Sequence, residues 1–200
     1  MTSPQIDVSR WSEAEQAEAI ALLELEAAGR HACLASPAAF AAHISGGRYE
    51  IAPHIALLDA ALVDLSEGRI GRLLVNMPPR HGKSETCSKY FPAWFIGSNP
   101  DKRVILASYE AEFAASWGRK ARDILEEHGG LFGVKLRHDS AAANRWNLAN
   151  YDGGMDTAGA GGAITGKGAN LLIIDDPLKN SEEAASETMP SSSIWVQRPS

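Results

Sequence analysis

The sequence predicts an α/β fold in which a mostly parallel sheet is flanked by helices and preceded by a small helical segment. Short continuous apolar runs at 72–77, 103–108 and 171–176 are typical of strands buried on both faces of a parallel sheet. Patterns of helical period lie between these runs, which is the alternation that α/β proteins show. Residues before 69 carry helical patterns alone.

Three helices are expected ahead of the first strand. A capping box at 12–15 begins the first helix, and Gly29 is expected to end it. Ser and Pro at 36–37 favour the start of a second helix that stops near 46–47. The third is expected over 53–68, with one apolar face made by Ile55, Leu58, Leu62 and Leu65.

The remaining elements follow the first strand. Residues 83–97 favour a helix strained at Pro92, because proline lacks the N–H that a helix interior needs. The segment 110–130 has the pattern of an amphipathic helix. Weaker strand signals occur at 145–149 and 158–169.

The composition is that of a soluble globular chain, with 44% apolar and 22% charged residues. No apolar run approaches the roughly 20 residues of a membrane span, so none is expected. Two cysteines, Cys33 and Cys87, favour a reducing compartment. The net charge is −6, yet residues 69–137 hold more Lys and Arg than Asp and Glu. This basic middle fits either a polyanion-binding surface or an ordinary mixed-charge surface.

The stretch "NMPPRHGKSE" (76–85) lies between an expected strand and an expected helix. In a phosphate-binding loop, Gly82 would let the backbone approach phosphates, Lys83 would reach the β- and γ-phosphates, and Ser84 would bind Mg²⁺. Met77 stands where the usual first glycine of this motif would be. The alternative is a helix N-terminus with an exposed lysine.

The stretch "LLIIDDP" (171–177) supplies two carboxylates at the end of a buried strand. A nucleotide-hydrolysing site needs one carboxylate for the Mg²⁺ shell, here Asp175, and one to orient or deprotonate the attacking water, here Asp176. The alternative is a strand that merely ends in a polar turn. Both motifs together favour the nucleotide site.

Three segments resemble the ATPase domain of the large terminase subunit of tailed bacteriophages, the motor that pumps DNA into the procapsid. They are "RLLVNMPPRHGKSE", "FPAWFIGSNPDKRVILASYEAEFAASWGRKARDIL" and "GAITGKGANLLIIDDPLKN", within a similarity from about Tyr49 to about Glu187. The resemblance implies a P-loop NTPase with an additional-strand catalytic-carboxylate core that uses ATP and Mg²⁺. It also implies double-stranded DNA, a small terminase subunit, a portal protein and a ring of copies as partners, in the host bacterial cytoplasm.

The resemblance also implies roles for individual residues. Lys83 would contact the β- and γ-phosphates, Arg80 would stabilise phosphate charge, and Asp176 would be the catalytic base. Ser84 and Asp175 would hold Mg²⁺. The nucleotide-binding loop would comprise Pro79, Arg80, His81, Gly82, Lys83, Ser84 and Glu85.

Two further groups of residues are candidates with alternatives. Tyr49 and His54 resemble the adenine-side element of the family, although His54 also fits a solvent-facing histidine at a helix start. Arg119, Lys120 and Arg122 could contact DNA phosphates or the nucleotide of a neighbouring subunit, or form an ordinary basic helix face.

The similarity is expected to end near Pro190, giving a helical segment (1–47), an incomplete ATPase domain (48–189) and a divergent tail (190–200). Pro190 and the serines after it are expected to break the next helix. The strand that the family places between the phosphate-loop strand and the Asp-Asp strand is therefore expected to be missing, and so is the nuclease domain. Rival interpretations are a degenerate prophage remnant without activity and another helicase-like P-loop ATPase.

Overall fold

The computed structural model describes residues 11–159, 168–177 and 193–197. The helices are α1 (Glu13–Leu34), α2 (Pro37–Ile44), α3 (Pro53–Ser66), the π-helical turn η2 (Glu85–Tyr90), α4 (Phe91–Ser98), α5 (Ala111–His128) and the 3₁₀ turn η3 (Gly129–Leu131). The strands are β1 (Arg72–Asn76), β2 (Arg103–Ser108), β3 (Leu136–Ala142), β4 (Arg145–Leu148), β5 (Gly154–Gly159), β6 (Leu171–Asp175) and β7 (Ser193–Gln197).

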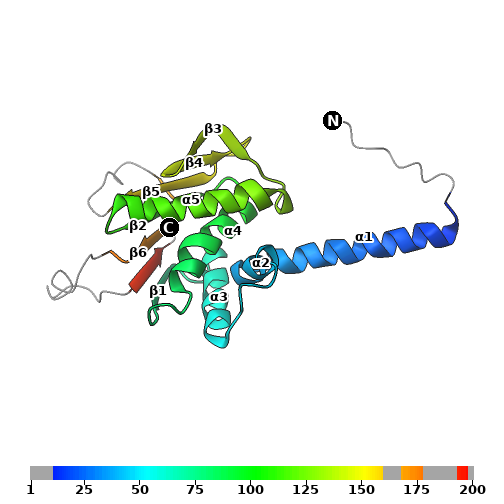
Figure 1. The fold of residues 1–200 in the computed structure, drawn as a ribbon, viewed down its shortest axis with the longest axis horizontal. Helices are drawn as coiled ribbons and strands as arrows, with labels where there is room; N and C mark the ends of the chain where they lie inside the picture. Colours follow the sequence, from blue (N-terminus) through cyan, green and yellow to red (C-terminus); the bar gives the residue numbers. More distant parts are fainter. Residues whose placement is uncertain (1–10, 160–167, 178–192, 198–200) are drawn as a thin grey trace.

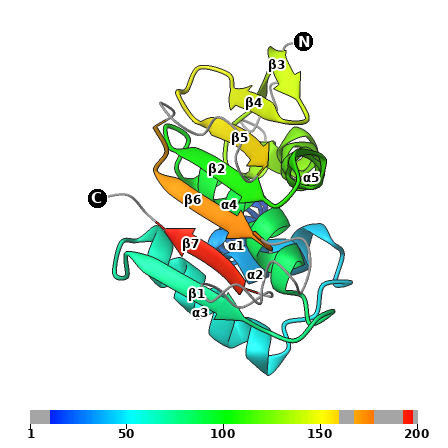
Figure 2. The same ribbon diagram turned by 90° about the vertical axis from the view of Figure 1, so that its left-hand side faces the viewer.

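The seven strands form one sheet in the order β1-β7-β6-β2-β5-β4-β3, which Figure 2 shows from edge to edge. β2 is parallel to both β5 and β6, whereas β7 is antiparallel to β1 and β6, and β4 is antiparallel to β3 and β5. The α/β class is confirmed, but the prediction of a mostly parallel sheet is wrong, since the sheet is mixed. The weak strand signal at 145–149 becomes β4, and an antiparallel ribbon of this kind extends the sheet without a crossover helix.

β7 occupies the place between β1 and β6 that was expected to be vacant. Its five residues pair in register with β1, from Arg72↔Gln197 to Asn76↔Ser193, and four of them pair with β6. The backbone N–H and C=O groups of β1 and β6 therefore bond to β7, and the two strands do not need to pair directly with each other. The expectation that no strand would lie between β1 and β6 is wrong, because residues 193–197, which were expected to belong to a divergent tail, form an antiparallel strand there.

The described helices lie on one side of the sheet (Figures 1 and 2). The apolar run of β1 predicted a strand buried on both faces. The strand is buried on one face only, because the described helices cover only that side of the sheet. Val75 is buried in the core, whereas its neighbour Leu74 points to the opposite face and is 49% exposed. β2, near the middle of the sheet, is buried from Val104 to Ser108, as expected.

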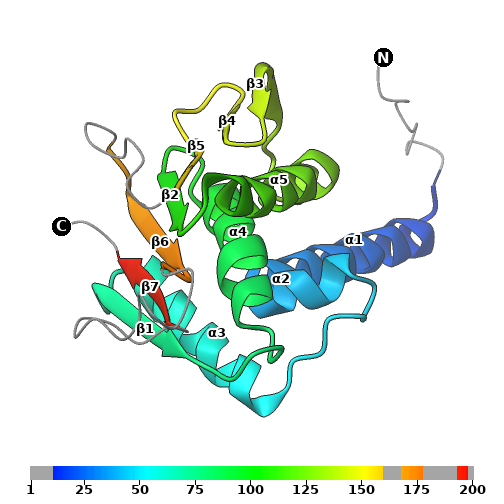
Figure 3. The same cartoon turned by 60° about the vertical axis from the view of Figure 1, so that its left-hand side comes forward.

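The first helix continues past Gly29, where the sequence predicted its end. Gly29 does not have positive φ, and α1 ends at Leu34. Glycine inside a helix lowers the stability of the helix by about 1 kcal/mol relative to alanine. Burial of the Cys33 side chain in the last turn of α1 helps to offset that loss. The outer part of α1 extends away from the sheet, where Ile20 and Leu23 are exposed (Figures 1 and 3).

The other helix predictions agree more closely with the structure. α2 and α3 begin at Pro37 and Pro53, and the four apolar residues expected on the third helix are buried. The expected helix over 83–97 is divided into η2 and α4, which meet beside Pro92. There the N–H of Phe91 donates to the carbonyl of Thr86, five residues earlier in the chain. This wider, π-helical turn lies just before Pro92, which has no N–H to continue the pattern. Residues 160–167 of the second weak strand signal lie outside the described residues.

None of the helices in the described ranges is long and apolar enough to cross a membrane. The core instead joins the sheet to the helices behind it, with the indole of Trp146 and the ring of Phe91 fully buried in it. α5 packs along β2 and β5, and α3 packs against β1. These two helices thereby flank the loop that follows β1.

Candidate functional site

The loop after β1 adopts a conformation that only certain residues tolerate. Gly82 has φ 84°, a conformation that favours glycine, and a Cβ atom on it would also crowd Cδ1 of Ile55 at 3.1 Å. Arg80 has φ 64°, which is strained for a residue with a side chain. Thr86 holds the loop closed, since its N–H and its hydroxyl both donate to the carbonyl of Gly82, at 2.9 and 2.8 Å.

The two predicted motifs meet at one edge of the sheet. β1 and β6 are each antiparallel to β7 and so run in the same direction, which brings their carboxyl ends together. Lys83 Nζ lies 2.9 Å from Asp176 Oδ1, and Ser84 Oγ donates to Asp175 Oδ1 at 3.3 Å. The structure thus places the phosphate-loop candidates in contact with both carboxylates.

Asp175 is a fully buried carboxyl group. Burial raises its pKa above the ordinary value, and the nearby charge of Asp176 acts in the same direction. Hydrogen bonds from Ser88 Oγ (2.7 Å) and Ser84 oppose this shift. Ser88 was not predicted, although it lies one helical turn after Ser84, and that spacing could have identified it.

The backbone of Asp176 is held in an unusual conformation by the end of β2. Its φ is 44°, in the left-handed region that aspartate tolerates better than most residues. Its carbonyl accepts from the N–H of Tyr109 (3.1 Å) and from Ser108 Oγ (3.4 Å). These bonds fix the direction in which the carboxylate leaves the strand.

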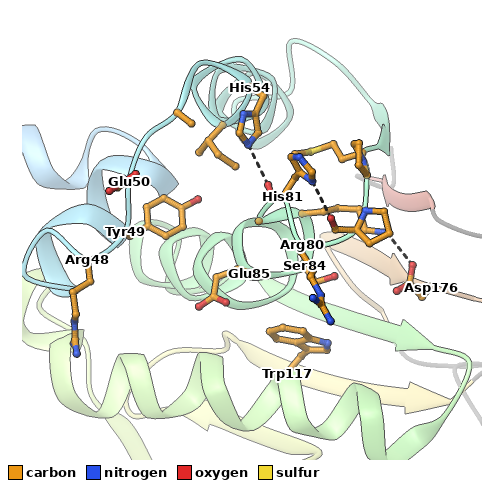
Figure 4. A pocket seen from close by; sticks show the side chains of 17 residues that line it. Arg48, Tyr49, Glu50, His54, Arg80, His81, Ser84, Glu85, Trp117 and Asp176 are labelled. Atoms are coloured by element: carbon orange, nitrogen blue, oxygen red, sulfur yellow. Dashed lines mark hydrogen bonds and ion pairs between the residues drawn. The ribbon is translucent and has the colours of Figure 1, made fainter.

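Tyr49 and His54 line the opposite side of the loop (Figure 4). The Tyr49 hydroxyl lies 2.6 Å from Thr86 Oγ1, and burial raises the pKa of Tyr49 to about 12. His54 Nε2 donates to the carbonyl of His81 at 3.2 Å. His54 is also exposed at the start of α3, so its role at the adenine side stays a prediction beside the alternative of a solvent-facing histidine.

These side chains surround a cavity of about 820 Å³. The predicted residues lining it are Tyr49, His54, Pro79, Arg80, His81, Gly82, Lys83, Ser84, Glu85 and Asp176. Sequence reasoning missed Arg48 and Glu50, which flank Tyr49, and Trp117, which comes from α5 (Figure 4). No local signal marks Trp117, because only the packing of α5 beside the loop brings it there.

The three basic candidates of α5 do not line this cavity. Lys120 Nζ lies 3.7 Å from the centre of the Trp117 ring, and Arg122 pairs with Asp123 at 2.6 Å. Arg119 is exposed. Their predicted contacts with DNA or a neighbouring subunit stay predictions.

Residues 74–195 match the family model for the N-terminal region of the terminase large subunit, T4-like-virus type. The matched range contains the phosphate-loop candidates, the Asp175–Asp176 pair and most of β7. No match to a curated protein or to a solved structure was found. Since the match covers more than half of the sequence, this chain belongs to the terminase large subunit family, through its N-terminal domain.

Proposed function

We propose that this chain binds Mg-ATP in the cavity at the end of β1 and hydrolyses it as the ATPase of a phage DNA-packaging motor. Membership of the terminase large subunit family suggests a component of such a motor. The observation that carries the ATPase proposal is the contact of Lys83 and Ser84 with Asp176 and Asp175, at 2.9 and 3.3 Å. Double-stranded DNA, a small subunit, a portal and further copies of the chain are the partners that this role would require.

In this proposal the ammonium group of Lys83 leaves the carboxylate of Asp176 and binds the phosphates of ATP. Its ammonium faces Asp176 in a nearly enclosed position, with only 11% of the side chain exposed. Phosphate oxygens are strong acceptors, so the β- and γ-phosphates would compete with Asp176 for this donor. Arg80, at the tip of the same loop, would add a second positive charge against the phosphates.

Ser84 and Asp175 suit a magnesium ion, since both offer oxygen donors and Asp175 is buried beside the loop. Within the described ranges, no three His, Cys, Asp or Glu side chains form a group that could hold a metal ion by themselves. Magnesium commonly takes one or two protein oxygens and completes its shell with phosphates and water, so a larger cluster is not required. When bound, the ion would neutralise charge on the transferring phosphoryl group.

Asp176 is the candidate base. It is more exposed than Asp175, with 35% of its side chain accessible, and it lines the cavity where an attacking water would stand. As Lys83 turns to the phosphates, the Asp176 carboxylate would be free to accept the proton of that water. Tyr49 and His54, at the other side of the loop, would contact the adenine of the nucleotide.

The test compares two substitutions with matched controls at the opposite end of the sheet. Asp176→Asn should keep or raise Mg-ATP affinity, because Asp176 no longer competes for Lys83, and should lower turnover about 10²–10⁴-fold, because a general base is removed. Lys83→Ala should weaken Mg-ATP binding about tenfold or more, because a charge-assisted contact is lost. Asp152→Asn and Lys102→Ala, which lie outside the cavity, should match the unsubstituted chain in calorimetric titration and phosphate release.

Three results would contradict the proposal. Equal Mg-ATP affinity in Lys83→Ala and the unsubstituted chain would remove the phosphate-binding role of the loop. Unchanged turnover in Asp176→Asn would remove Asp176 as the base. A chain that binds no nucleotide at all would leave the degenerate remnant as the better interpretation.

A further inference from the structure

Three tryptophans on the described helices and strands have buried indoles, and one differs from the others. Nε1 of Trp94 donates to the carbonyl of Leu34 at 2.8 Å, and Nε1 of Trp146 donates to that of Gly118 at 3.0 Å. Nε1 of Trp117 is also buried but has no hydrogen-bond partner among the described residues. A buried donor without an acceptor is unfavourable, which suggests that something outside the chain supplies one.

The indole of Trp117 cannot easily turn to find an acceptor within the protein. The ammonium of Lys120 lies over its ring at 3.7 Å, and the ring of Phe113 meets it edge to face, with centroids 6.1 Å apart. Only 9% of the residue is exposed. These contacts fix the ring from the side of its own helix.

Trp117 is nevertheless part of the cavity wall. It lines the same cavity as Lys83 and Ser84, and Figure 4 shows it across the loop from His54. Of the three carboxylates that line the cavity, Glu85 pairs with Lys89 and Asp176 with Lys83, while Glu50 lies beside Tyr49 on the other side of the loop. The part of the cavity beside Trp117 therefore combines basic loop residues with an unsatisfied donor, a combination that suits an anion.

On the basis of the proposed function, we propose that Trp117 is a further nucleotide-binding residue whose indole N–H donates to a phosphate oxygen. Indole is a donor only, so it needs an acceptor, and phosphate oxygens are the strongest acceptors that a nucleotide offers. The base is the less suitable partner, because Tyr49 and His54 lie at the other side of the loop. Because Nε1 is buried, neighbouring side chains of the loop must move aside as the nucleotide binds, and the contact would then place α5 against the phosphates.

Indole N–H resonances of ¹⁵N-labelled protein test the contact directly. The resonance missing from Trp117→Phe identifies Trp117, and Mg²⁺ with a non-hydrolysable ATP analogue should move it downfield as the hydrogen bond forms. The resonances of Trp94 and Trp146 serve as internal controls, since their donors are already bonded. Mg²⁺ with adenosine, which has no phosphate, should leave the Trp117 resonance in place.

Affinity supplies the second measurement. Trp117→Phe keeps an aromatic ring and removes the donor, so the Kd for the Mg²⁺-bound analogue should rise about tenfold. Trp94→Phe removes an indole donor outside the cavity and should leave that Kd unchanged. If Trp117→Phe fails to fold, the resonances of the unsubstituted chain still decide the question, assigned by replacing the other tryptophans.

The outcomes separate this inference from the proposed function. If the analogue binds and Lys83→Ala weakens it, but the Trp117 resonance and the Kd of Trp117→Phe do not change, the inference is wrong and the ATPase proposal stands. If adenosine alone moves the resonance, the partner is not a phosphate and the inference is wrong. If the unsubstituted chain binds no analogue, both fail.

Discussion

The position of β7 between β1 and β6 makes a strong prediction about stability. In a strand with neighbours on both sides, every backbone N–H points to one neighbour or the other. Val196, in the interior of β7, is opposite Leu73 on β1 and Ile173 on β6. Val196→Pro removes one ladder hydrogen bond, worth about 0.5–1.5 kcal/mol, and leaves an acceptor unpaired, at about 1–3 kcal/mol. The expected loss is about 2–4 kcal/mol out of a total of about 5–15 kcal/mol.

Val196→Ala is the matched variant, because it shortens the same side chain and keeps the N–H. Urea titrations followed by circular dichroism give the free energy of unfolding of each variant. Val196→Pro should be less stable than Val196→Ala by about 2–4 kcal/mol. For a chain of this size the melting temperature should fall by roughly 4–16 °C. If Val196→Pro and Val196→Ala unfold alike, β7 does not pair between β1 and β6 in solution.

Two further predictions concern the cavity and α5. Tyr49→Phe should cost about 1 kcal/mol of stability through loss of the 2.6 Å contact with Thr86, measured by urea unfolding; an unchanged stability would mean that this contact contributes nothing. Replacing Arg119, Lys120 and Arg122 together with alanine should flatten the salt dependence of DNA binding if these residues meet phosphates. Absence of DNA binding by the unsubstituted chain at low salt would contradict that role.

The contact between the two motifs could be predicted because it depends on short local patterns. Gly82 and the residues after it mark a strand-to-helix loop, and Asp175 and Asp176 mark the end of a strand. In α/β sheets such ends commonly meet at one edge. The prediction needed only the directions of β1 and β6, and these agree with it even though β7 runs antiparallel between them.

Strand pairing over long separations could not be predicted in the same way. The segment 193–197 has no local signal that selects β1 and β6 as its neighbours, because pairing depends on which edges the rest of the fold leaves available. Trp117 is similar, since its helical pattern fits a core residue and only the docking of α5 turns it toward the loop. The apolar run of β1 misled for a related reason: it resembles a doubly buried strand, but the described helices cover one face of the sheet and leave Leu74 exposed on the other.

Asp175 combines a cost to stability with a proposed role in function. Its pKa is raised above the ordinary 3.8 mainly by burial, so the folded chain holds the proton more tightly than the unfolded chain. The favourable contribution of this group is therefore complete below about pH 3.8 and is lost as the pH rises through the raised pKa. At neutral pH the buried carboxylate lowers the free energy of unfolding.

Asp175→Asn should remove this loss, because the amide is uncharged at every pH and can still bond to Ser84 and Ser88. We expect the variant to melt close to the unsubstituted chain near pH 3.5 and above it at pH 7. With Mg-ATP present, the unsubstituted chain should melt above Asp175→Asn at pH 7. The ligand would stabilise the unsubstituted chain more, because its carboxylate would hold the magnesium ion. A variant that is less stable by the same amount at every pH would show that the hydrogen bonds of the carboxylate outweigh its burial. A variant that is more stable than the unsubstituted chain at pH 7 would show that the fold keeps an unfavourable buried charge beside Ser84, which is the cost that the proposed magnesium-binding role of Asp175 would explain.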